Sequence, residues 1–336
     1  MALMISSQRT PLVSVIVVYW NNRKTIVQCL SALAAQTMTD FEIVLIDNGS
    51  TDEGLKDLAH QFPQLDLRIE RLSANQGFAI GNNIGARLAR GQWLALLNAD
   101  AFPTPDWLAN LLDAAQRQPE FSFFASCLLQ ANDPSRFDGA GDVYHITGLA
   151  WRRFHNQPLT PAGLIEEEVF SPCGAAALFR REAFLSVGGF DEDFGSYHED
   201  VDLGFRLRLL GERCLYVPRA IVYHVGSVSF GKKSHFVVYH GHRNLVWTYI
   251  KNMPTRLFWQ YLPAHLFATV FYLIYYSLNG NAQAIWQAKI DALRGMPNAL
   301  RKRRKVQRTV RVHISDLDRV FEHSWTRYWN FAWYRR

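Results

Sequence analysis

The first 120 residues alternate between two hydrophobic patterns. Continuous apolar runs, such as VSVIVVY at 13–19 and FEIVLIDN at 41–48, are typical of strands buried on both faces. The segments between them space their apolar residues along one face of a helix, as RKTIVQCLSALAAQ does at 23–36. Strands that alternate with helices predict an α/β fold whose parallel sheet is covered on both faces.

The same alternation continues to the end of this segment. It predicts a strand at 65–72, a helix at 77–90 and a strand at 93–99. Ser50 and Glu53 form a capping box, which predicts a helix start directly after the second strand. Another start is expected at Thr104-Pro105-Asp106, with Thr104 as the N-cap and the proline at the first helical position.

Beyond residue 120 the pattern becomes irregular, with short strands, turns and many aromatic residues up to about residue 235. One helix is expected there, EDVDLGFRLRLLG at 199–211, ended by its last glycine. Residues 257–278 contain no Lys, Arg, Asp or Glu, and the basic sequence RKRRKVQR follows at 301–308. These changes divide the chain into three expected units, at 11–120, 121–250 and 251–336.

The net charge of +6 is unevenly distributed. Residues 251–336 hold 15 Lys and Arg against 4 Asp and Glu, a net of +11, so the first 250 residues hold 21 against 26, a net of −5. This asymmetry predicts that the C-terminal region faces a polyanion, either an anionic membrane surface or a nucleic acid. Because no nucleic-acid-binding motif is recognisable, we expect the membrane surface and no nucleic-acid partner.

The four cysteines lie far apart and form no CxxC pair: Cys29, Cys127, Cys173 and Cys214. Their spacing suits a reducing cytosol and argues against a disulfide framework or a structural zinc site. At the N-terminus, Arg9 precedes the apolar run at 13–19, but no small-residue cleavage site follows it. A strand is therefore expected there rather than a signal peptide.

Polar residues follow two of the expected strands where each one ends. In parallel α/β sheets ligands bind beyond the carboxyl ends of the strands, and Asp47, Asn48, Asn98 and Asp100 fall at those ends. A carboxylate at position 47 can accept a hydrogen bond from the imide N–H of uracil or thymine. The Gly-Ser-Thr turn after it offers backbone donors to an anion. Ordinary turn formation by the same residues stays open as an alternative.

The glycine- and asparagine-rich segment NQGFAIGNNIG at 75–85 lets backbone approach a phosphate or ribose, although glycines at a helix start also serve packing. A dinucleotide-binding oxidoreductase would need a GxGxxG turn after the first strand. The first strand instead runs into YWNNRKT, which contains no glycine. This absence argues against a nicotinamide-dependent enzyme.

Three acids, Glu199, Asp200 and Asp202, cluster in the first turn of the helix expected at 199–211. Acids there stabilise the helix dipole, which is a purely structural explanation. A carboxylate in that place could also act as a general base on a sugar hydroxyl. His224 follows an expected strand; it is either structural or, if it converges on Asp100, part of a site for a divalent ion.

In this order, the segments resemble an inverting glycosyltransferase of family 2, with the GT-A fold. The likeness runs from about Pro11 to Lys251 and is strongest to bacterial rhamnosyltransferases that act on lipid-linked glycans. The stretches that carry it are VSVIVVYWN, FEIVLIDNGSTD, NQGFAIGNNIG, WLALLNADA, CGAAALFRREAFLSVGGFDEDF, YHEDVDLGFRLRLLG and YHVGSVS, extended by HRNLVWTYIKNMP. The resemblance implies a Rossmann-like, mostly parallel mixed sheet, an acceptor-binding half and a helical C-terminal extension.

For the donor, a dTDP- or UDP-sugar, the resemblance implies a binding site at the strand ends. Asp47 would read the pyrimidine base, and Tyr19, Asn48, Asn75 and Gly77 would line the rest of the nucleotide-sugar site. Asn98 and Asp100 would also contact the donor, because they occupy the family's acidic metal-binding box.

That box implies Mg²⁺ or Mn²⁺, held by Asp100 on the donor diphosphate with His224 able to join the metal shell. This sequence departs from the family's pattern at Asn98, an amide where the box has a carboxylate. Hard divalent ions prefer carboxylates and phosphates, so we expect a metal held largely by Asp100 and the donor itself.

Asp200 matches the family's catalytic base and Glu199 its neighbour. Arg243 and Asn244 match an Arg-Asn pair of the rhamnosyltransferase-like members, near a diphosphate of donor or acceptor. The implied reaction is a single in-line displacement with inversion. The QxxRW signature of processive synthases is absent, so addition of one sugar is expected.

The expected function is transfer of a single sugar, L-rhamnose from dTDP-rhamnose, to a polyprenyl-diphosphate-linked glycan in cell-surface polysaccharide synthesis. A UDP-hexose or UDP-galactofuranose donor and a non-catalytic nucleotide-sugar-binding subunit are the alternatives. The expected location is the cytoplasmic face of the bacterial inner membrane. Residues 257–278 would lie in the membrane plane or re-enter it, span it, or form a buried helical subdomain.

Overall fold

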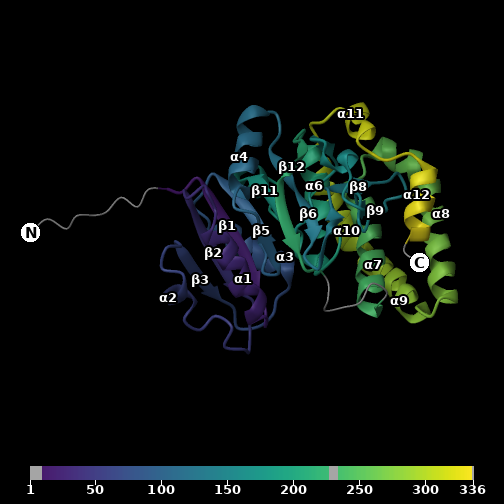
Figure 1. Ribbon diagram of the computed structural model, residues 1–336. Coiled ribbons are helices and arrows are strands. Elements are labelled where there is room, and N and C mark those ends of the chain that lie inside the picture. Colours follow the sequence, from purple (N-terminus) through teal and green to yellow (C-terminus); the bar gives the residue numbers. More distant parts are fainter. Residues whose placement is uncertain (1–9, 227–233, 335–336) are drawn as a thin grey trace, which may run out of the picture.

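The computed structural model describes residues 10–226 and 234–334 (Figure 1). Its main sheet has the strand order β10-β12-β6-β11-β4-β1-β2-β3. The N-terminal strands lie parallel in it: β1 (Val13–Tyr19), β2 (Phe41–Asp47), β3 (Leu67–Arg71) and β4 (Trp93–Asn98). All four were expected from the sequence, and the α/β prediction is confirmed.

The second half of the sheet is mixed. β11 (Ala176–Arg180) runs antiparallel to both β4 and β6 (Phe123–Gln130), and β12 (Cys214–His224) runs parallel to β6. Because two reversals restore the original direction, β6 and β12 point the same way as β4. The carboxyl ends of β1 to β4, β6 and β12 therefore meet at one edge of a mostly parallel sheet.

Short strands complete the sheet margins. β5 (Ala101–Pro103) and β10 (Glu167–Val169) pair antiparallel with β12, and β7 (Asp133–Gly139) pairs antiparallel with β6. A separate hairpin is formed by β8 (Asp142–Tyr144) and β9 (Ala150–Arg152). Two short 3₁₀ turns lie at Pro161–Leu164 and Glu192–Phe194.

Helices cover both faces of the sheet, as expected. α1 (Arg23–Ala34) and α4 (Trp107–Arg117) pack on one face, and α3 (Phe78–Leu88), α5 (Arg181–Ser186) and α6 (Glu199–Leu209) on the other. Within β1, Val13, Val15 and Val17 enter the first core, whereas Ile16 enters the second. A strand with a core on each face needs apolar residues at every position, which explains the continuous run in the sequence.

The helix expected to start at Ser50 does not form. The Ser50 N–H donates to Asp47 Oδ1 at 2.9 Å, and Asn21 Oδ1 accepts the N–H of Thr51 at 2.8 Å. The backbone donors of this turn are thus taken by side chains from elsewhere, and Asp57 adopts a left-handed φ of +61°. Only the short helix α2 (Leu58–Gln61) follows.

The helix start expected at Thr104 is displaced to Trp107. Asp106 takes the N-cap position of α4, and the Thr104 hydroxyl instead donates to the carbonyl oxygen of Ile221 at 3.1 Å. The strand expected to end before His224 is also longer than expected, since His224 is the last residue of β12.

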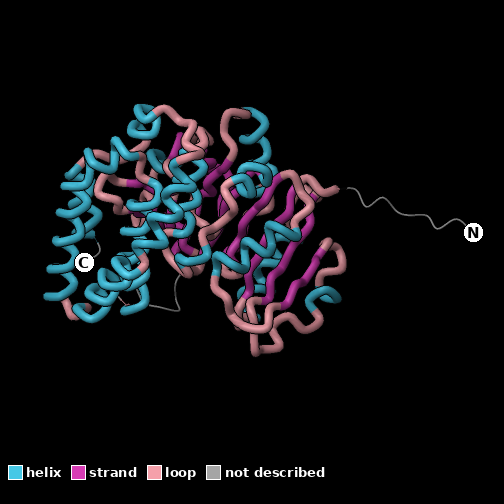
Figure 2. The backbone as a smooth tube through the Cα atoms, turned by 180° about the vertical axis from the view of Figure 1, so that it is seen from behind, coloured by secondary structure: helices cyan, strands magenta, loops and turns pink. Residues whose placement is uncertain are grey.

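The C-terminal third is helical, as expected. It contains α7 (His235–Asn252), α8 (Thr255–Leu278), α9 (Ala282–Arg294), α10 (Met296–Gln307), α11 (Ile314–Arg319) and α12 (Trp325–Tyr334). These helices gather at the end of the molecule opposite β3 (Figures 1 and 2). α7 crosses the boundary expected at residue 250, and the division into three units stays a prediction.

Buried ion pairs fasten this helical region to the sheet domain. Lys251 Nζ lies 2.5 Å from Asp191 Oδ2 and 2.6 Å from Asp202 Oδ1. Lys302 also pairs with Asp191, and the Arg303 guanidinium donates to backbone carbonyls at the end of α7. Two members of the basic cluster at 301–308 are therefore structural, and the exposed ones are Arg301, Arg304, Lys305 and Arg308.

Among the described residues, α8 is the one helix long and apolar enough to cross a membrane by length and composition. Its most apolar window has a mean hydropathy of 1.3, and 28% of that window is buried inside the protein. The other residues of that window are partly or fully exposed, so part of this apolar surface faces away from the protein.

Candidate active site

The turn after β2 forms the first part of the candidate site. Asp47 ends the strand, and 12% of its side chain stays exposed, with Oδ2 at 4.0 Å from Arg71 Nε. Gly49 has a φ of +71°, and a Cβ there would lie 2.3 Å from the carbonyl carbon of Ala74. Only glycine allows the turn to pack this closely on the neighbouring loop. The carboxylate of Asp47 is thereby held at the sheet edge, largely buried but with part of its surface open.

Asn75 and Gly77 lie on that neighbouring loop, and Asn48 fixes its shape. Asn48 Nδ2 donates to Asn75 Oδ1 at 2.9 Å, and Asn48 Oδ1 accepts the Gln76 N–H at 2.8 Å. Asn48 is buried, as is Tyr19, whose hydroxyl donates to Asp52 at 2.7 Å. The direct donor contacts expected of the Tyr19 and Asn48 side chains do not fit this burial. Both support the loop, while Asn75 and Gly77 remain accessible.

Asn98, Asp100 and His224 converge, as predicted for a cation site. His224 Nε2 lies 3.4 Å from Asp100 Oδ1 and 3.5 Å from Asn98 Nδ2. The described residues contain no group of three or more His, Cys, Asp and Glu side chains arranged to hold a metal ion. A cation at this place would therefore have one carboxylate and one imidazole, with the Asn98 amide, and would need further oxygen ligands from a bound molecule.

Asp138, which the sequence did not suggest, orients His224. Its Oδ2 lies 2.8 Å from His224 Nδ1 and 2.6 Å from Arg152 Nη1. Burial alone would lower the pKa of His224, but hydrogen bonds to Asp100 and Asp138 raise it to about 9. Burial alone would raise the pKa of Asp138, but the charges of Arg152 and His224 hold it well below its usual range. The bond at Nδ1 leaves Nε2 facing Asp100, the arrangement common around metal-binding histidines.

Asp200 lies in the first turn of α6 with both carboxylate oxygens held by backbone. Oδ2 accepts the Gly174 N–H at 3.0 Å, and Oδ1 accepts the Val201 N–H at 2.8 Å. Burial and the nearby charge of Asp200 raise the pKa of Glu199 well above its usual value. A carboxyl group with a raised pKa beside an oriented carboxylate is an arrangement suited to proton transfer.

The segment around Gly174 joins the separate parts of the site. The Gly174 N–H binds Asp200, and the next residue's carbonyl, Ala175, accepts the N–H of Asn98 at 2.9 Å. A Cβ on Gly174 would lie 3.1 Å from the ring of Phe78, which begins α3 beside Gly77. Asp200, the end of β4 and the start of α3 therefore meet at one place, although they are distant in sequence.

Arg243 and Asn244 lie on α7 beneath the turn that precedes Glu199. Asn244 is fully buried, and its amide donates to the carbonyl oxygens of Phe194, Ser196 and Tyr197 at 2.7 to 3.0 Å. Asn244 therefore holds this turn and has no exposed atom for a diphosphate, contrary to the contact expected from the sequence. The Arg243 guanidinium also binds the Phe194 carbonyl, at 2.9 Å, but is partly exposed, so its expected diphosphate contact stays a prediction.

Known proteins are similar to this chain in sequence. Residues 14–188 match the family model described as "Glycosyl transferase family 2". The matched segment includes Asp47, Asn98 and Asp100 but ends before Asp200. The chain is 30% identical over 257 residues to the N-acetylglucosaminyl-diphospho-decaprenol L-rhamnosyltransferase of Mycobacterium tuberculosis, covering 69% of this chain and 82% of that protein. It is 35% identical over 231 residues to the O-antigen biosynthesis protein RfbC of Myxococcus xanthus, of which it spans 18%.

Solved structures resemble the fold at lower identity. A mannosyltransferase from Pyrobaculum calidifontis, determined with GDP-Man and Mn²⁺, superposes with a TM-score of 0.55 at 19% identity over 89% of this chain and 86% of its own. S. aureus TarS residues 1–349 with UDP-GlcNAc superposes with a TM-score of 0.57 at 19% identity over 89% and 83%. These likenesses concern the fold, and they agree with the GT-A architecture expected from the sequence.

Proposed function

The chain belongs to glycosyltransferase family 2, and we propose that it adds one sugar, with inversion, to a polyprenyl-diphosphate-linked glycan. L-Rhamnose from dTDP-rhamnose is the proposed donor sugar. The observation that carries this proposal is the meeting of Asp200 with the Asn98–Asp100–His224 group through the segment around Gly174. The mycobacterial relative, named as a rhamnosyltransferase of a diphospho-decaprenol-linked acceptor, supports both the donor sugar and the acceptor class.

Asp200 is the proposed general base. A carboxylate has about four lone-pair positions, and backbone N–H groups use one on each oxygen, so positions remain to accept the acceptor hydroxyl. As the proton moves to Asp200, the hydroxyl oxygen bonds to the anomeric carbon of the donor sugar. The bond from that carbon to the diphosphate oxygen breaks, and the nucleoside diphosphate leaves.

Glu199 and the residues proposed to bind the donor support this displacement by placing charge and substrate correctly. Because its pKa is raised, Glu199 carries less negative charge beside Asp200 than an ordinary carboxylate would. Asp47 is proposed to bind the imide N–H of thymine or uracil, and Asn75 and Gly77 to contact the nucleotide sugar. These contacts would fix the anomeric carbon between Asp200 and the cation group.

The residues present fit a divalent cation of the Mg²⁺ or Mn²⁺ type. Asp100 supplies a carboxylate oxygen, and His224 would present Nε2, whose proton a bound cation would have to displace, because Asp138 holds Nδ1. A bound cation would act as a Lewis acid that offsets the charge of the departing diphosphate. Asn98 can contribute its amide oxygen without charge, so the donor diphosphate is proposed to supply the remaining ligands.

Replacement of Asp138 by asparagine is expected to weaken Mn²⁺ binding by about 10- to 100-fold, because His224 loses the carboxylate that fixes its orientation. Electron paramagnetic resonance of Mn²⁺ with nucleoside diphosphate measures this directly. Asp133→Asn, at an exposed position of the same strand, is the control. Equal Mn²⁺ affinity of the Asp138 variant and the control would remove the orienting role.

Replacement of Asn98 by aspartate is expected to tighten the binding of Mg²⁺ or Mn²⁺, because a carboxylate replaces an uncharged amide beside Asp100 and His224. The metal concentration that gives half-maximal transfer should fall. An unchanged metal dependence would show that position 98 does not ligate.

A donor panel tests the proposed function. The purified chain is incubated with dTDP-rhamnose, UDP-galactose, UDP-galactofuranose and other nucleotide sugars, a synthetic lipid-diphosphate acceptor, and Mg²⁺ or Mn²⁺. Transfer from dTDP-rhamnose alone is expected. Transfer from a UDP-sugar would correct the donor, and donor binding without transfer would favour a non-catalytic binding subunit.

The location we propose is the cytoplasmic face of the bacterial inner membrane, with peripheral or monotopic attachment. A lipid-linked acceptor requires the site to approach a bilayer, and the net charge of +11 in residues 251–336 favours anionic headgroups.

A further inference from the structure

The inner side of α8 is fixed to the protein. Its buried residues recur along one face of the helix: Leu257, Tyr261, His265, Ala268, Tyr272 and Tyr276. His265 Nδ1 hydrogen-bonds the carbonyl oxygen of Thr147 at 2.8 Å, and the Tyr261 hydroxyl donates to Asp318 at 2.8 Å. The His265 ring also stacks on Tyr249, with 4.0 Å between ring centroids. A helix that crossed a bilayer by itself would have to give up these contacts.

The outer side of α8 is a second apolar stripe, and it is exposed. Its residues, 53 to 80% exposed, are Trp259, Leu266, Val270, Ile274 and Leu278. α9 packs against α7 and α8 through Ala284, Ile285, Ala288 and Ala292, and it exposes 44 to 64% of Trp286, Ile290 and Leu293. We call these eight exposed residues the outer face. So many large apolar side chains on two adjacent helices mark an interaction surface.

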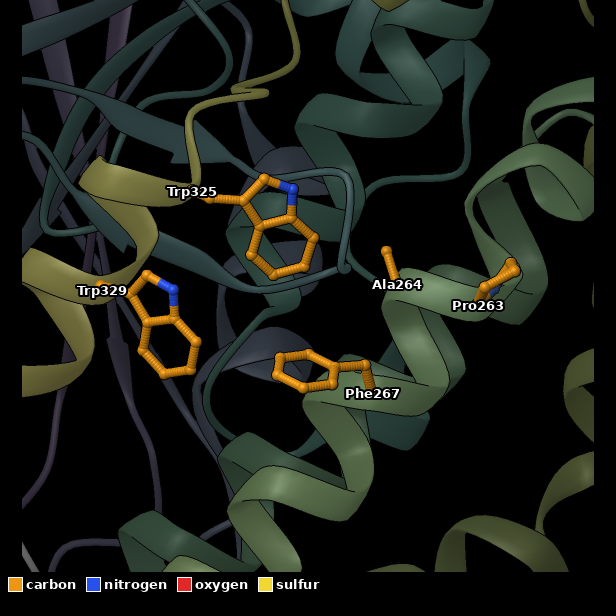
Figure 3. Close-up of a pocket in the computed structure, with 5 residues that line it drawn as sticks. All are labelled: Pro263, Ala264, Phe267, Trp325 and Trp329. Atoms are coloured by element: carbon orange, nitrogen blue, oxygen red, sulfur yellow. The ribbon is translucent and has the colours of Figure 1, made fainter.

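A shallow apolar pocket adjoins the outer face (Figure 3). It has a volume of about 440 Å³ and is lined by Pro263, Ala264 and Phe267 of α8 and by Trp325 and Trp329 of α12. Figure 3 shows both indole rings turned toward the Phe267 side of α8, with 5.7 Å between the centroids of Phe267 and Trp325. Tryptophan is enriched where protein meets the bilayer interface, which favours a lipid occupant.

The charge around the outer face also favours an anionic bilayer. From Thr255 to Ile290 the sequence contains no Asp or Glu, so no carboxylate of this segment repels lipid headgroups. Arg294 and Arg327 near its margins have side chains 76% and 74% exposed, each paired with a carboxylate, Asp291 at 2.9 Å and Glu322 at 2.7 Å. The net charge of residues 251–336 is +11, which anionic headgroups complement and a second copy of the same region would repel.

The outer face is connected to the acceptor side of the candidate site through α7. α9 binds α7 through Tyr239 Oη and Asp291 at 3.0 Å, and Lys289 donates to the carbonyl of His242 at 3.3 Å. α7 in turn holds the turn before Glu199 through Asn244. In Figure 1, α9 lies beside α7 at the edge of the helical region.

We propose that the outer face rests on an anionic bilayer with α8 parallel to the membrane plane, and that this contact brings a lipid-diphosphate acceptor to the Asp200 side of the site. The delivery of a lipid-diphosphate acceptor rests on the proposed function, whereas the membrane contact does not. The buried inner stripe keeps α8 on the protein, and the exposed outer stripe and the Trp-lined pocket enter the lipid surface.

Flotation of the full chain with vesicles of phosphatidylcholine and phosphatidylglycerol tests the proposal. The variant is Leu266→Gln, Val270→Gln, Ile274→Gln and Leu278→Gln together. Its vesicle partitioning is expected to fall about a hundredfold or more, because four exposed apolar side chains no longer enter lipid. The control changes four exposed apolar residues elsewhere, Leu159, Leu164, Ile165 and Leu185, to glutamine and is expected to float like the unchanged chain.

Three results would overturn the proposal: equal flotation of the variant and the control, resistance of the bound chain to alkaline carbonate extraction, as a spanning helix would show, or a dimer that the variant converts to a monomer. Sugar transfer to a water-soluble acceptor fragment is measured in parallel. It should be unchanged in the variant, whereas absence of transfer in the unchanged chain would contradict the proposed function and leave the flotation result interpretable.

Discussion

Replacement of Asp200 by asparagine is expected to lower the turnover number for sugar transfer by roughly 10²- to 10⁴-fold, the range for loss of a general base. The asparagine side chain has nearly the same shape and keeps one acceptor oxygen, so it can retain one of the two backbone hydrogen bonds that Asp200 accepts. It cannot take a proton from the acceptor hydroxyl. The turnover number is measured at saturating donor, acceptor and metal.

Two measurements separate this effect from a structural one. Donor affinity, by isothermal titration calorimetry, should be unchanged, because Asp200 is not proposed to contact the nucleotide. Glu212→Gln, a partly exposed change beyond the end of the same helix, should leave turnover unchanged. If Asp200→Asn turns over at the normal rate, the base has been misidentified.

Replacement of Asp100 by asparagine is expected to reduce transfer roughly a hundredfold, because the cation group loses its single carboxylate ligand from the protein. The Asn98 amide and His224 would remain beside the donor diphosphate. Part of the loss should be recovered at high Mn²⁺ concentration, since the diphosphate still offers oxygen ligands.

Mn²⁺ binding in the presence of nucleoside diphosphate, followed by electron paramagnetic resonance, distinguishes a lost ligand from a lost fold. Asp113→Asn, on the exposed side of the following helix, is the matched control. Normal Mn²⁺ affinity together with normal transfer in Asp100→Asn would contradict the cation site.

Much of the fold was predictable because both faces of the sheet are covered. A strand with two cores leaves a continuous apolar run, which identified β1, β2 and β4 within one residue of their ends. The direction of β11 was not predictable, because a short apolar run such as AALFR is the same in either orientation. The capping box at Ser50 failed for a related reason: its backbone donors bind Asn21 and Asp47, contacts that no local pattern reveals.

The candidate site was predictable where its polar and charged residues lie at the ends of strands. Asn98, Asp100 and His224 converge as expected because β4 and β12 point the same way. Asp138 was missed because it lies in the glycine-rich sequence FDGAGD, which resembles an ordinary turn. Asn244 was assigned to a ligand, although it is buried, because residue type and order do not indicate exposure.

The anomeric configuration of the reaction product tests the central claim most directly. After transfer from the accepted nucleotide sugar to the lipid-diphosphate acceptor, NMR of the purified product reads the configuration of the new glycosidic bond. A single displacement with Asp200 as the base predicts a configuration opposite to that of the donor. Retention of the donor configuration would contradict the account.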